Sequence, residues 1–409
     1  MKRREALTAL MATAAAGAMA AVPRVPARAG DAPSVSAACD AATGALGVVI
    51  ERASGSVLIV DWAARAVKSR VEGLGDLSHA SVVFSRDARF AYVFGRDGGL
   101  SKVDLVTGQL SARIIQAGNA IGGAISDDGR LLAVSNYEPG GVRVFDADTL
   151  APVCEISADP GTGKRSKTVG LVDAPGRRFV YTLYDAGEIW IADFTNMSSG
   201  MPSVTRFADV GKLPYDASIT SDGRHYIAGL FGEDGLVHLD LWQDAPKPRR
   251  ILDGYGRGEA PLPVFKMPHL EGWAEVAGRF LLPAVGRHEL LAVDAETFTE
   301  CGRVATHGQP IFAVVQPGSP RVWVNFAHPL NDTVQVIDAR TMAVVHAFKP
   351  GPAVLHLEFT PRGHETWISV RDADRIDIHD TRTFERIASI PAVKPSGIFF
   401  TARAHRIGQ

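Results

Sequence analysis

Three of the twelve histidines, His79, His269 and His356, each come third in a short segment that recurs along the chain: Leu-Ser-His, Met-Pro-His and Val-Leu-His. A neutral imidazole binds transition metals, and its ordinary pKa also lets it transfer protons near neutral pH. The sequence therefore suggests His79 and His269 as catalytic candidates, with His79 also a candidate metal ligand. For each histidine the alternative is an ordinary loop residue bonded to a backbone carbonyl, and for His356 we favour that structural role.

Arg96, in Gly-Arg-Asp, is the candidate for anion binding. The planar guanidinium of arginine binds carboxylates through two parallel hydrogen bonds. The alternative is an ion pair with the adjacent Asp97. The sequence contains no dinucleotide-binding fingerprint and no His/Asp/Glu cluster with metal-ligand spacing, so any redox chemistry requires an external electron acceptor.

The composition excludes several classes of protein. The chain carries 43 Lys and Arg against 45 Asp and Glu, which argues against nucleic acid as the main partner and against a polybasic membrane anchor. Its three cysteines form no C-x-x-C pair. That excludes a zinc ribbon, a thioredoxin-type site, a C-x-x-C-H haem attachment and a disulfide-stapled scaffold.

The elements that must position these side chains are short β-strands. Apolar runs such as 90–94, 131–134 and 322–325 alternate with Asp- and Gly-rich turns, which is typical of antiparallel strands. A repeat of about 45 residues with four short strands predicts an all-β, eight-bladed β-propeller over residues 44–409. The repeat is marked by an apolar strand that ends in aspartate, at Asp61, Asp104, Asp146, Asp193, Asp240, Asp294, Asp338 and Asp380.

A propeller must close its ring, so we expect residues 47–50 to pair with residues 398–402. The loops that lead into the innermost strands lie beside the central channel on one face. The three histidine segments and Tyr215 fall in these loops, among small and apolar residues. This pattern predicts an apolar cup with a few polar groups, suited to a flat hydrophobic ligand.

The N-terminus predicts an export signal over residues 1–29, with a basic segment at 2–4, an Ala-rich run at 6–22 and a small-x-small cleavage site at 27–29. The arginine pair and the weakly apolar run favour twin-arginine export, and the Sec route stays open. The run is shorter than the ~20 residues that a membrane span requires, so we expect no integral membrane segment in the mature chain. We expect a periplasmic protein with a flexible leader over residues 30–43; an N-terminal membrane anchor is the alternative.

The stretch around His79 resembles a known family. Residues 76–87 (DLSHASVVFSRD) and 90–100 (FAYVFGRDGGL) are similar to the NirF family of haem d1 biosynthesis proteins, relatives of the eight-bladed d1 domain of cytochrome cd1 nitrite reductase. The likeness runs from about residue 45 to 409 and is most specific in this stretch. It implies a periplasmic propeller that binds haem d1 or its late precursor during assembly of that cofactor.

The resemblance also implies a haem d1 pocket with four residues in named roles. His79 falls at the position of the axial iron ligand, and Arg96 matches an arginine that pairs with the carboxylates of the macrocycle. Tyr137 matches a pocket tyrosine. His269 matches one of two distal histidines, where it would act as general acid or base. The second distal histidine and the c-haem domain of the reductase have no counterpart, which speaks against nitrite reduction by this chain.

The function implied is completion of haem d1 or its delivery to cd1 nitrite reductase, with other periplasmic d1-assembly proteins as partners. Whether the protein is an enzyme stays open. As an enzyme it would be an oxidoreductase of the dihydro-haem d1 dehydrogenase type, oxidising a tetrapyrrole side chain while His269 moves a proton. The alternative from another class is a non-enzymatic protein-interaction scaffold in d1 assembly, which predicts no affinity for tetrapyrroles. A quinone- or metal-dependent dehydrogenase is a third alternative.

Overall fold

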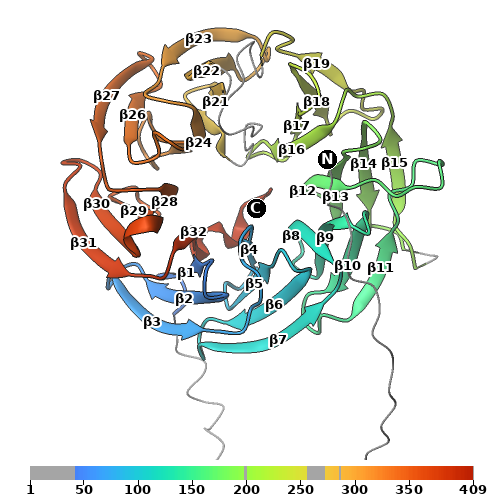
Figure 1. The fold of residues 1–409 in the computed structure, drawn as a ribbon. Helices are drawn as coiled ribbons and strands as arrows, with labels where there is room; N and C mark the ends of the chain where they lie inside the picture. Colours follow the sequence, from blue (N-terminus) through green and yellow to red (C-terminus); the bar gives the residue numbers. More distant parts are fainter. Residues whose placement is uncertain (1–41, 198–199, 256–271, 285–286, 409) are drawn as a thin grey trace, which may run out of the picture. The chain divides into compact units, whose positions relative to one another are not determined.

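The computed structural model describes residues 42–408, except 198–199, 256–271 and 285–286. Eight four-stranded antiparallel sheets follow one another around a ring (Figure 1). The prediction of an all-β, eight-bladed propeller is confirmed. The expected signal peptide and all of the leader except Ala42 and Thr43 lie outside the described residues. Within the described part, no helix is long and apolar enough to cross a membrane.

Each blade contains four strands. Their labels follow the chain, and within each blade they are given in order from the channel outward. Blades 1 to 3 contain β32 (Pro395–Phe400), β1 (Leu46–Glu51), β2 (Ser56–Asp61) and β3 (Ala66–Val71); β4 (Ser81–Phe84), β5 (Phe90–Phe94), β6 (Gly99–Asp104) and β7 (Gln109–Ile115); β8 (Asn119–Ile125), β9 (Leu131–Glu138), β10 (Val142–Asp146) and β11 (Pro152–Ile156). Blades 4 and 5 contain β12 (Thr168–Ala174), β13 (Arg178–Leu183), β14 (Glu188–Asp193) and β15 (Ser203–Phe207); β16 (Pro214–Ile219), β17 (His225–Leu230), β18 (Leu236–Asp240) and β19 (Arg249–Ile251). Blades 6 to 8 contain β20 (Ala274–Val276), β21 (Arg279–Ala284), β22 (Glu289–Asp294) and β23 (Glu300–Ala305); β24 (Pro310–Val315), β25 (Arg321–Phe326), β26 (Val334–Asp338) and β27 (Ala343–Phe348); β28 (Val354–Phe359), β29 (Glu365–Val370), β30 (Arg375–Asp380) and β31 (Arg386–Pro391).

The repeated aspartates end the third strand of every blade, as the sequence predicted. Their carboxylates accept hydrogen bonds from backbone N–H groups two or three residues further on, and five of the eight accept from both. Asp146 Oδ1, for example, accepts from Thr149 N at 2.8 Å, and Asp380 Oδ1 accepts from Thr383 N at 2.8 Å. Such Asx turns reverse the chain without help from distant residues, which explains why the aspartate marks the period so clearly.

Ring closure follows the predicted pairing, because Val49 of β1 opposes Ile398 of β32. The C-terminal strand ends at Phe400, two residues earlier than expected, where the chain turns into the 3-10 helix η4 (Thr401–His405). The C-terminal end of the described chain therefore lies near the centre of the ring (Figure 1).

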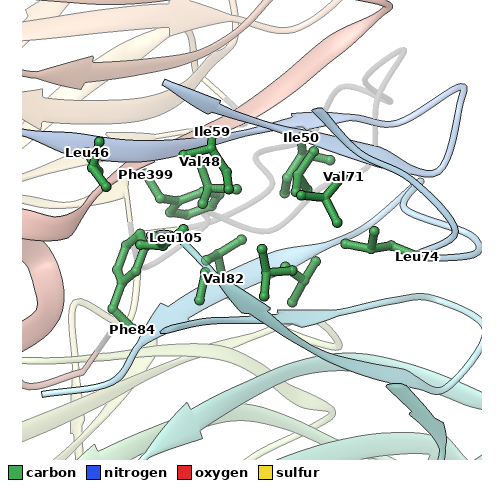
Figure 2. Close-up of a cluster of buried hydrophobic side chains, with 14 of the residues drawn as sticks. Leu46, Val48, Ile50, Ile59, Val71, Leu74, Val82, Phe84, Leu105 and Phe399 are labelled. Atoms are coloured by element: carbon green, nitrogen blue, oxygen red, sulfur yellow. The ribbon is translucent and has the colours of Figure 1, made fainter. Parts of the chain in front are cut away.

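The hydrophobic core lies between neighbouring blades. Val48 and Ile50 of β1 pack with Val82 of β4, between blades 1 and 2 (Figure 2). Val49, between them in sequence, faces the other way and packs with Trp367 of blade 8. Side chains alternate across a strand, so strands covered on both faces are apolar at nearly every position. This packing holds the loops at both ends of the channel in place.

Candidate functional site

We call the face that carries the loops leading into the innermost strands the upper face. A cavity of about 300 Å³ lies there. Most of its lining residues are small or apolar and come from the first residues of innermost strands, as the sequence predicted. The titratable side chains that line it are Arg52, His79, Tyr215, Asp216 and His356.

His79 lies at the mouth of this cavity, in the turn between β3 and β4, and its side chain is exposed. The turn is fixed by Asp76, whose Oδ1 accepts a hydrogen bond from Ser78 N at 2.8 Å. Hydrogen bonds from Ser78 keep the pKa of Asp76 below its usual range, and the nearby Arg96 and His79 add to this effect. An exposed imidazole in a fixed turn beside a cavity can reach a bound ligand.

Arg96 and Tyr137, chosen from the sequence, lie together. The guanidinium carbon of Arg96 is 5.2 Å from the centre of the Tyr137 ring, and the Tyr137 hydroxyl is hydrogen-bonded to the Tyr215 hydroxyl at 2.5 Å. The alternative role for Arg96 is wrong, because Asp97 instead forms an ion pair with Arg113 at 2.7 Å. The positive charge of Arg96 is therefore not neutralised by its sequence neighbour.

The two hydrogen-bonded tyrosines belong to an aromatic wall. Tyr215 contacts the rings of Tyr184 and Phe231, with centroid distances of 5.8 and 5.6 Å. Burial raises the pKa of Tyr137 and of Tyr215, and the shared hydrogen bond raises that of Tyr137 further. Both phenols are therefore protonated at neutral pH. Only one of the two hydroxyl hydrogens forms the bond between the tyrosines, so the other can be donated elsewhere.

Arg52 is a further candidate site residue, and it was not predicted from the sequence. It lines the cavity from the turn after β1, and within the described residues its guanidinium has no hydrogen bond or ion pair. Burial and the nearby Arg371 lower the pKa of Arg52, while Asp76 opposes this shift. Alignment of the repeats would have found it, because Arg371 and Arg96 follow the second strands of the two adjacent blades. Arg371 differs in being paired with Asp372 at 2.8 Å.

The structure describes only one of the two remaining channel-face histidines. His269 lies outside the described residues, so its proposed acid–base and haem d1-binding roles stay predictions. His356 lines the cavity, and its Nδ1 accepts a hydrogen bond from Ile398 N at 3.2 Å. Burial, together with the charge of Arg403, lowers the pKa of His356 to about 3. His356 is thus neutral at physiological pH and has one ring nitrogen already engaged by the fold.

Comparison with known proteins agrees with this geometry. Residues 41–404 match the cytochrome D1 heme domain family. Protein NirF of Pseudomonas aeruginosa is 57% identical over 368 residues, 90% of this chain and 93% of that protein. Protein NirF of Stutzerimonas stutzeri is 54% identical over 368 residues, 90% of this chain and 94% of that protein.

Among solved structures, dihydro-heme d1 dehydrogenase NirN in complex with DHE superposes with a TM-score of 0.78 at 27% identity, covering 90% of this chain and 77% of that chain. The class is therefore clear: the chain is an eight-bladed propeller of the cytochrome D1 heme domain family. Within that class it belongs to the NirF family, as the resemblance around His79 implied.

Proposed function

We propose that this protein binds haem d1, or a late precursor of it, in the upper-face cavity and takes part in completing or delivering that cofactor for cytochrome cd1 nitrite reductase. The observation that carries the proposal is that His79, Arg52 and Tyr215 line one cavity, while Tyr137, which is hydrogen-bonded to Tyr215, contacts Arg96. The complex of the related NirN with DHE supports a tetrapyrrole as the ligand class.

The side chains around the cavity suit such a ligand. Imidazole is a standard ligand of haem iron, and His79 is exposed at the mouth, where it can reach the metal. Arg52 and Arg96 have no carboxylate partner in the described chain and offer paired N–H donors to the carboxylates of the macrocycle. Tyr215, packed against Tyr184 and Phe231, adds a flat aromatic surface to the cavity lining.

The relationship with dihydro-heme d1 dehydrogenase favours a second candidate, oxidation of a tetrapyrrole side chain. Forming a carbon–carbon double bond in this way removes two electrons and two protons from the substrate. The electrons must pass to an acceptor outside this chain. His269 is our candidate for accepting a proton. His356 is a poor general base, because its pKa lies far below neutral pH.

We further propose that the protein acts in the periplasm, reached through the predicted signal at residues 1–29. Its protein partners would then be other periplasmic d1-assembly proteins and the reductase that receives the cofactor. A scaffold without tetrapyrrole affinity is the competing outcome of the experiment below.

The test is a visible-absorption titration of the purified protein with haem d1, for wild type, His79→Ala and His364→Ala. His364 is an exposed histidine in the turn between β28 and β29, away from the cavity, and serves as the matched control. We expect wild type and His364→Ala to bind with a shifted spectrum. The loss of an axial ligand in His79→Ala should weaken binding at least about tenfold, which corresponds to ~1.4 kcal/mol, or change the spectrum. Failure of the wild type to bind haem d1 would contradict the proposal and favour the protein-interaction scaffold.

Enzyme and carrier are separated by incubating the wild type with the dihydro precursor and an electron acceptor under anaerobic conditions. Formation of haem d1 supports the dehydrogenase. Binding without conversion supports the carrier.

A further inference from the structure

His356 is the third residue of β28 in blade 8, and its ring lines the upper-face cavity. The ring contacts two aromatic side chains, with centroid distances of 5.8 Å to Phe312 and 5.4 Å to Phe399. These contacts fix the plane of the imidazole. The backbone N–H of His356 donates to Ser369 Oγ at 2.8 Å, which fixes the strand beneath it.

The hydrogen bond from Ile398 determines the tautomer of His356. A backbone N–H can only donate, so Nδ1, which accepts it at 3.2 Å, carries no proton. Burial lowers the pKa of His356 to about 3, which keeps the ring neutral at physiological pH. The single ring proton of the neutral imidazole therefore resides on Nε2.

The Nε2–H group has no partner in the described part of the chain, because the ring hydrogen bond of His356 is the one at Nδ1. The ring is half-buried, and Nε2 is not among the buried side-chain atoms that lack a hydrogen-bond partner. An N–H donor of this kind, at the wall of a cavity, is available to an acceptor on a bound molecule.

We propose that His356 is a specificity-determining residue of the cavity, whose Nε2–H donates a hydrogen bond to an uncharged carbonyl oxygen on the periphery of the bound tetrapyrrole. This inference rests on the proposed function. A neutral donor matches a neutral acceptor, whereas the cationic Arg52, which lines the cavity, and Arg96 match carboxylates. Iron ligation by His356 is disfavoured, since Nδ1 is engaged by Ile398 and Nε2 carries the proton.

The experiment compares two iron tetrapyrroles, haem d1, whose macrocycle carries oxo groups, and haem b, which has none. Both are titrated into wild type, His356→Phe and His356→Gln. Phenylalanine fits the aromatic surroundings but has no donor. Glutamine can accept from Ile398 N with its oxygen and donate with its amide. We expect His356→Phe to lose haem d1 affinity about tenfold with little change for haem b, and His356→Gln to recover most of the loss.

An equal loss for both tetrapyrroles, or no loss for haem d1, would overturn the inference and leave His356 a structural residue. A measurement on the wild type alone covers the case in which His356→Phe does not fold. The carbonyl stretching frequency of bound haem d1 should fall relative to the free compound, and an unshifted band overturns the inference. If the wild type binds no haem d1 at all, the proposed function fails first. If the wild type binds haem d1 but His356→Phe does not change the preference for haem d1 over haem b, only this inference fails.

Discussion

The two ends of the channel use the same kind of side chain in opposite ways. At the lower end, Arg86 donates to the carbonyl of Ala404 at 2.7 Å and pairs with Asp173 at 3.3 Å, and Arg403 pairs with Glu358 at 2.5 Å. At the upper end, Arg52 has no such acceptor in the described chain. An arginine saturated by its own chain stabilises the fold, whereas one left unsaturated at a cavity is available to a ligand.

The lower end also differs because the C-terminal segment crosses it. This segment leaves β32 of blade 1 and reaches blade 4, where Gly408 N donates to Asp173 Oδ1 at 2.8 Å. Ile407 packs against the core between blades 4 and 5. The chain thus supplies its own partners at the lower end, and we expect variants there to change stability and variants above to change binding.

The largest expected change in free energy is the loss of folding stability in Arg86→Ala. This change leaves Asp173, whose side chain is 1% exposed, without its cation and frees the carbonyls that Arg86 holds. Breaking a buried ion pair in this way costs about 3–5 kcal/mol. Urea denaturation should show a loss of that order in the free energy of unfolding. Haem d1 affinity, measured on the folded variant, should stay at the wild-type value, and a large loss of affinity would contradict the contrast between the two ends.

A somewhat smaller change in the free energy of unfolding is expected when Asp173 titrates. Burial raises the pKa of Asp173 from 3.8 to about 6 in the folded protein, although Gly408 and Arg86 oppose this shift. The raised pKa means that folding favours the protonated carboxyl. This contribution is fully present below the unfolded pKa and is lost as the pH rises through 6, and it amounts to about 3 kcal/mol.

The measurement compares the free energies of unfolding of the wild type and Asp173→Asn at pH 4 and pH 7. The stability of the wild type relative to the variant should fall as the pH rises, because asparagine does not titrate. Other titrating groups cancel in the difference. A difference that is constant with pH would show that the carboxylate is fully compensated by its partners.

The smallest of the three changes in free energy is expected at the upper end, where it concerns the binding of haem d1. The double variant Arg52→Ala/Arg96→Ala removes two cations that have no partner in the described chain. Haem d1 affinity should fall by about 30-fold, or ~2 kcal/mol, because charge-assisted hydrogen bonds to carboxylates are lost. The free energy of unfolding should change by less than about 0.5 kcal/mol, as for ordinary surface changes. Arg371→Ala is the matched control, since Arg371 is already paired with Asp372. A loss of stability without a loss of affinity would contradict the assignment.

The repeat in the sequence was sufficient to predict eight blades, which the structure confirms, and to predict which loops lie beside the channel. The physical reason is that both depend on local chemistry repeated in every blade. The carboxylate of Asp146 bonds to a backbone group only three residues away, and the same turn follows Asp380. Once the period is known, the loop containing His79 falls beside the channel, and the structure places it there.

Which side chains meet, and in what protonation state, depends on the tertiary structure. Tyr137 and Tyr215 bond across 78 residues, and Ile398 sets the tautomer of His356 across 42. The availability of Arg52 likewise depends on its neighbours. Such relations depend on how one blade is placed against the next and on closure of the ring, which no short stretch of sequence encodes.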